Sequence, residues 1–64
     1  MAVTPGQLSA ALAQQAEEHR REGDRFRDMP ARIMNKGMSE QRAYTQYTLA
    51  DAFDRLANAL DQLP

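Results

Sequence analysis

The 64-residue chain has a formal net charge of −1, one His and no Cys, and eleven of its 27 hydrophobic residues are Ala. This composition excludes a disulfide framework and a Cys-based zinc site, and so short a chain is only marginally stable on its own core. The sequence therefore predicts one small domain, residues 1–64, that oligomerises to complete its core.

No stretch of the sequence suits a signal peptide or a membrane span. The N-terminus lacks a basic segment followed by a long apolar run, and no apolar run approaches the roughly 20 residues that cross a bilayer. The lack of Cys fits a reducing compartment. We therefore expect a soluble, cytoplasmic protein that does not bind to membranes.

The first predicted element is a helix over residues 5–28. Thr4 can cap its first turn, Pro5 suits the first helical position, and Gln7 stands where a capping box needs Glu or Gln. An inward face recurs at helical spacing, and its members are Leu8, Leu12, Ala16, His19, Gly23 and Phe26. The small residues on this face would let another helix approach closely, and Gly23 marks either a bend or a close crossing.

A short connector should follow this helix. Pro30 ends the helix, because the residue before a proline is pushed away from helical angles. Residues 30–36 are predicted to form a short helix, which Gly37 is placed to end in a left-handed conformation. The connector has an apolar side, made of Met29, Ile33, Met34 and Met38. Since Met side chains are adaptable, this side is either a docking site for a partner protein or gap-filling in the end of a bundle.

The second long helix is predicted over residues 40–63, with Ser39 as its N-cap. Its large apolar residues are spaced by four, three, four and three, and they are Leu49, Phe53, Leu56, Leu60 and Leu63. This spacing is typical of a helical seam that faces another helix. We assign these five residues to self-association.

These elements predict an all-α fold. Two helices of matched length joined by a short connector form an antiparallel hairpin. Two such hairpins packed face to face form a dimeric four-helix bundle, which is the favoured oligomer, although the spacing also permits higher assemblies.

Charge is unevenly distributed along the chain. Residues 25–42 carry a net charge of +3, whereas residues 1–24 and 43–64 each carry −2. Basic side chains beside two tyrosines can hold a phosphate and stack a base, and the set consists of Arg27, Arg32, Lys36, Arg42, Tyr44 and Tyr47. The simpler interpretation is that the charges are solvated and that the tyrosines extend the apolar seam.

No residue pattern indicates a catalytic, cofactor or metal site. His19 has possible hydrogen-bond partners at helical spacing, Gln15 and Glu22, but no constellation of Ser, His and Asp emerges, so His19 is interpreted as a packed or half-exposed structural residue. The acidic residues of the second helix, Asp51, Asp54 and Asp61, lie mostly off the Leu seam and form a solvated face. Nucleic acid is an unlikely partner because the net charge is negative and no continuous basic stripe exists.

The sequence therefore favours a small non-enzymatic interaction protein. Such a hairpin would self-associate and dock on a larger partner protein, as inhibitors, anti-activators and adaptors of bacterial or phage origin do. The docking residues would be those of the connector, Ile33 and Met34 together with the basic and aromatic set above. The alternative is a binder of a phosphate-bearing ligand, such as a nucleotide or signalling dinucleotide, at the basic connector.

Overall fold

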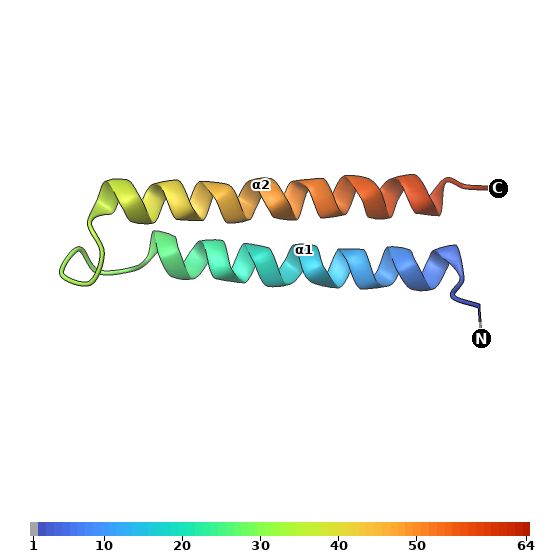
Figure 1. The fold of residues 1–64 in the computed structure, drawn as a ribbon, viewed down its shortest axis with the longest axis horizontal. Coiled ribbons are helices and arrows are strands. Elements are labelled where there is room, and N and C mark those ends of the chain that lie inside the picture. The colour runs from blue at the N-terminus through green and yellow to red at the C-terminus, as the bar shows by residue number, and fades with distance from the viewer. Residues whose placement is uncertain (1) are drawn as a thin grey trace.

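The computed structural model describes residues 2–64. Within them it has two helices, α1 (Pro5–Arg27) and α2 (Lys36–Asp61), which lie side by side and run in opposite directions (Figure 1). The predicted all-α class and the packing of two long helices into a hairpin are confirmed.

The start of α1 follows the predicted capping box. The amide of Gln7 donates to Thr4 Oγ1 over 3.1 Å, and the amide of Thr4 donates back to Gln7 Oε1 over 2.9 Å. Two amides that the helix leaves without partners are therefore satisfied. The helix ends at Arg27, one residue before the predicted end, and Asp28 forms its C-cap.

The connector is a turn, so the predicted short helix over residues 30–36 is wrong. The carbonyl of Pro30 accepts from the amides of Ile33 and Met34, over 3.0 and 3.2 Å. These two hydrogen bonds close a single turn. The chain then becomes extended at Asn35, whose φ and ψ are −61° and 152°.

The predicted start of the second helix is also wrong, because Asn35 takes the capping role. Its Oδ1 accepts from the amide of Met38 over 2.8 Å, so α2 begins at Lys36, four residues earlier than expected. Ser39 lies inside the first turn, fully buried, and its hydroxyl donates to the carbonyl of Lys36 over 3.0 Å. Gly37 is helical, and no glycine in residues 2–64 has a positive φ.

The two helices meet along small side chains. We call this line the small-residue seam, and its members are Ser9, Ala16 and Gly23 from α1 with Ser39, Ala43, Ala50 and Ala57 from α2. The residues of α1 recur every seven positions, as do the three alanines of α2, which keeps each set on one side of its helix. At one end of the seam the hydroxyl of Ser9 donates to the carbonyl of Ala57 over 3.2 Å.

The hairpin has no interior beyond this seam. The Cα atoms extend over 49 × 19 × 12 Å, which is a layer one helix thick. Every fully buried residue of the described chain is Ala, Ser or Gly. The large apolar residues that were predicted to face a partner helix therefore lie beside the intrachain seam and not in it.

Candidate interaction surface

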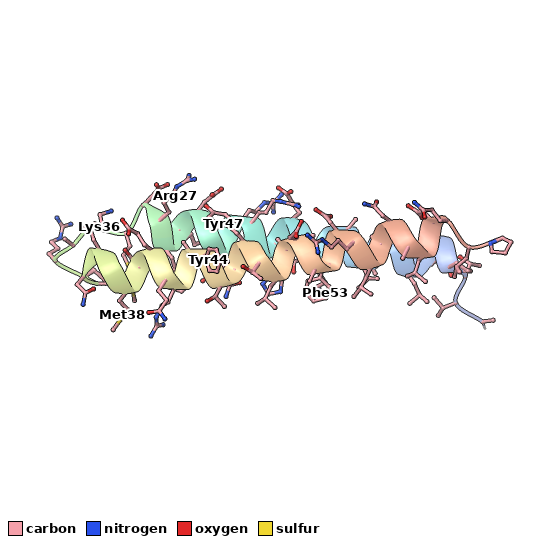
Figure 2. All side chains as sticks on the ribbon, turned by 90° about the horizontal axis from the view of Figure 1, so that it is seen from above. Arg27, Lys36, Met38, Tyr44, Tyr47 and Phe53 are labelled. Atoms are coloured by element: carbon pink, nitrogen blue, oxygen red, sulfur yellow. The ribbon has the colours of Figure 1, made fainter. Side chains whose placement is uncertain are left out.

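The two broad sides of the hairpin differ in chemistry. On a helical wheel, the large apolar residues of both helices fall on the same side of the small-residue seam. We call this side the apolar face, and its members are Leu8, Leu12 and Phe26 from α1 with Met38, Leu49, Phe53, Leu56, Leu60 and Leu63 from the second half of the chain. In Figure 2, Met38 and Phe53 lie along one edge of the hairpin, whereas Arg27 and Tyr47 lie along the opposite edge.

Much of the apolar face is accessible to solvent. Leu56 and Leu63 are 54% and 56% exposed, and Leu8 and Met38 are each 45% exposed. Phe53 and Leu60 are half-buried. The residues assigned to self-association from the sequence are thus left partly uncovered by the chain's own fold.

A polar pair lies in the middle of the apolar face. His19 stacks on Phe53 with ring centroids 5.3 Å apart and planes 6° from parallel. Its Nδ1 lies 2.6 Å from Oε1 of Gln46. Because a carbonyl oxygen only accepts, Nδ1 donates, and in the neutral imidazole Nε2 then keeps its lone pair. His19 therefore links the two helices, as its structural interpretation implied, but through Gln46 of α2 and not through a neighbour on its own helix.

Near the connector, an arginine covers part of the apolar face. The guanidinium carbon of Arg42 lies 5.8 Å from the centroid of the Phe26 ring, within the range of a cation–π contact. Arg42 therefore has its aromatic partner on the apolar face, and neither of the predicted tyrosines provides it.

We call the opposite side the polar face. A cluster around Tyr47 joins the two helices on this side. The ring packs over Gly23, where a side-chain carbon would lie only 2.7 Å from Tyr47 Cε1. The phenol donates to Asp24 Oδ1, and Arg27 Nη2 lies 3.4 Å from the same oxygen. Gly23 therefore permits a close crossing, one of the two interpretations that the sequence left open.

The contacts in this cluster raise the pKa values of two of its side chains. The hydrogen bond to Asp24, with a smaller contribution from burial, raises the pKa of Tyr47 above its ordinary value of 10.0. The charges of Tyr47, Asp24 and Asp28 raise the pKa of Arg27 in turn. The polar face also carries an ion pair between the helices, in which Arg20 Nη2 contacts Asp54 Oδ2. These charged contacts are largely open to water and add little to stability.

The structure spreads the predicted ligand-binding residues over several surfaces. Arg32 and Ile33 are exposed on the connector turn, and Met34 is half-buried. Lys36 donates to the carbonyl of Arg27 over 3.3 Å, so these two basic residues lie together. Tyr44 is 72% exposed, points away from α1 in Figure 2, and has no contact with the Tyr47 cluster among the described hydrogen bonds. The proposed phosphate site stays a prediction.

The described residues form no enclosed site. Residues 2–64 contain no cavity and no group of three or more His, Cys, Asp or Glu that could hold a metal ion. Neither α1 nor α2 combines the length and apolar character that a membrane-crossing helix needs.

No protein family, curated protein or solved structure matches the chain.

Sequence reasoning placed Ala16 and Gly23 in the contact between the helices but missed the rest of the small-residue seam. Ser9 and Ala43 were not singled out, although both belong to series that repeat every seven residues. That period was the available signal, because small residues at one heptad position allow two helices to approach closely.

Proposed function

We propose that the chain is a non-enzymatic interaction protein that works as an assembly of helical hairpins, with a dimeric four-helix bundle as its basic unit. The observation that carries this proposal is the apolar face, where large side chains from both helices stay partly exposed beside a seam of small ones. A face of this kind marks a protein interaction surface.

The exposed area supports association. The accessible surface is 4912 Å², whereas a compact monomer of this mass has about 4,100 Å². The excess of about 800 Å² equals what one partner contributes to an interface of standard size. Burying the apolar face between two hairpins would bring the area per chain to that of a compact protein.

The connector end is the proposed contact with a larger protein. Ile33 is 66% exposed on the turn, flanked by Arg32 and, three residues later, by Lys36. An apolar side chain framed by cations fits a partner with an apolar pocket and an acidic rim. This end lies beyond the apolar face, so it stays accessible when two hairpins pair.

Sedimentation equilibrium at micromolar concentration tests the assembly. The wild-type chain is expected to have the mass of two chains. Leu56→Asp places a charge on the apolar face and should shift the mass to one chain with loss of helical circular dichroism. Asn58→Asp introduces the same charge at an exposed position of α2 away from that face and should leave the dimer intact. A wild-type monomer with full helix content would refute the proposal.

The docking end is tested separately in the host lysate. The tagged wild-type protein and an Ile33→Asp variant are compared with Ala52→Asp, which lies at an exposed position of α2. We expect a co-purifying protein that is lost with Ile33→Asp and retained with Ala52→Asp. Equal recovery with both variants would exclude the connector as the contact.

A further inference from the structure

We infer that two copies pair through their apolar faces in antiparallel orientation, with the connector of each hairpin beside the open end of the other. The open end is the end opposite the connector, where the first turn of α1 and the last turn of α2 lie together (Figure 1). This inference rests on the proposed function and adds to it the occupant of the face, the orientation and the register.

The extent of the apolar face requires nearly full overlap of the two hairpins. The face runs from Met38, near the connector, to Leu63 at the open end. The hairpin is 49 Å long and 19 Å wide, so its broad side is about the size of one half of a standard interface. A pairing shifted along the long axis would leave leucines of one end in water.

Full overlap is compatible with a parallel or an antiparallel arrangement, and charge distinguishes them. Residues 25–42 at the connector carry +3. In the half of the hairpin nearer the open end, residues 5–14 carry no charge, and along α2 Asp51, Asp54 and Asp61 outnumber Arg55 to give −2. A parallel pair brings the two basic connectors together and the two acidic halves together. An antiparallel pair places each basic connector beside the acidic half of the other copy, which is the favourable arrangement.

The polar pair on the apolar face fixes the register of an antiparallel dimer. His19 and Gln46 each lie within about one helical turn of the midpoint of their helix. Only residues near the middle of the hairpin meet their own copies when two antiparallel hairpins overlap fully. The two His19–Gln46 pairs therefore come together at the two-fold axis.

The polar groups that meet at the two-fold axis can form hydrogen bonds with one another. In the neutral imidazole, Nδ1 of His19 donates to Gln46 Oε1 and Nε2 is left as an acceptor. The side-chain NH₂ of Gln46 supplies donors, so the amide of one copy can donate to the imidazole of the other. A shifted register would place these polar atoms against leucine without hydrogen-bond partners, which is unfavourable.

Distances between spin labels test the orientation. The chain has no Cys, so single labels can be placed at the exposed positions Arg32→Cys, at the connector, and Gln62→Cys, at the open end. In this antiparallel dimer, two Gln62 labels lie on opposite sides of the two-fold axis and about 48 Å apart, because sixteen residues at about 1.5 Å each separate Gln62 from Gln46 at the axis. A mixture of the two variants should add a distance of about 20 Å, the thickness of two helix layers with their labels.

The outcomes separate this inference from the proposed function. A label at Thr48→Cys, exposed near the middle of α2, reports pairing in either orientation and serves as the control. A distance of about 20 Å between two Gln62 labels would overturn the antiparallel arrangement and leave the dimer standing. The absence of any distance between chains, with a sedimentation mass of one chain, would overturn both.

Discussion

Replacing Gly23 by Ala tests whether the two helices are as close as the small-residue seam requires. An added Cβ would lie 2.7, 3.0 and 3.1 Å from three atoms of the Tyr47 ring. The ring would have to retreat by about 0.7 Å to restore the 3.4 Å at which ordinary contact begins. That movement also disturbs the hydrogen bond from the Tyr47 phenol to Asp24.

Two opposing effects set the magnitude. Alanine is better than glycine inside a helix by about 1 kcal/mol. Inserting a carbon into a tightly packed contact costs about 1–3 kcal/mol. We therefore expect Gly23→Ala to lower the free energy of unfolding by about 1 kcal/mol, which corresponds to a fall in Tm of about 4–8 °C.

Urea denaturation followed by circular dichroism at 222 nm measures this change, at one fixed protein concentration because assembly contributes to stability. The decisive control is Gly23→Ala in a Tyr47→Ala background. Without the ring, the same substitution should stabilise the protein by about 1 kcal/mol. The reasoning is refuted if Gly23→Ala is equally stabilising in both backgrounds, because the ring would then not press on the helix.

Three further predictions concern the seam, the connector and the polar face. Ala50→Leu overpacks a residue that is 1% exposed, so the free energy of unfolding should fall by about 2 kcal/mol in urea titrations. Ala59→Leu, at an exposed position of the same helix, should change it by less than about 0.5 kcal/mol. Asn35→Ala removes the cap of α2 and should cost about 1 kcal/mol in thermal unfolding, whereas Asn35→Ser should restore most of the loss; equal losses would show that the cap is unimportant. The fold raises the pKa of Tyr47, so the neutral phenol stabilises the folded state. This contribution to the free energy of unfolding is fully present below pH 10.0 and is lost as the pH rises through the raised pKa of the folded state. In a Tyr44→Phe variant the remaining phenol should therefore titrate above 10.0 by ultraviolet absorbance, and Asp24→Asn should lower that midpoint.

The helix boundaries show what local sequence determines. Thr4, Pro5 and Gln7 specify one start without competition, and the structure has that start. At the second helix, Asn35 and Ser39 are both good N-caps, and only the path of the chain after Pro30 decides between them. With Ser39 taken as the N-cap, Gly37 falls before the helix and is expected to be left-handed, whereas with Asn35 as the N-cap Gly37 lies inside the first turn.

The inner contact of the hairpin was less accessible to sequence reasoning. Leu49 and Leu56 recur seven residues apart, and so do Ala50 and Ala57 on the adjacent stripe of the same helix. Both stripes satisfy the spacing of a helical seam, and sequence alone does not state which one faces α1. The close approach allowed by Ser9, Ala16 and Gly23 resolves this choice, which depends on contacts between residues far apart in the chain.

The division between small and large side chains assigns the contact within one chain and the proposed contact between chains to different residues. Substitutions along the small-residue seam change how closely the two helices of one chain pack, whereas substitutions among the flanking leucines are expected to change which other helices the hairpin accepts. A few leucine substitutions should therefore convert a pair of identical chains into a pair of different ones without altering the residues that join α1 to α2.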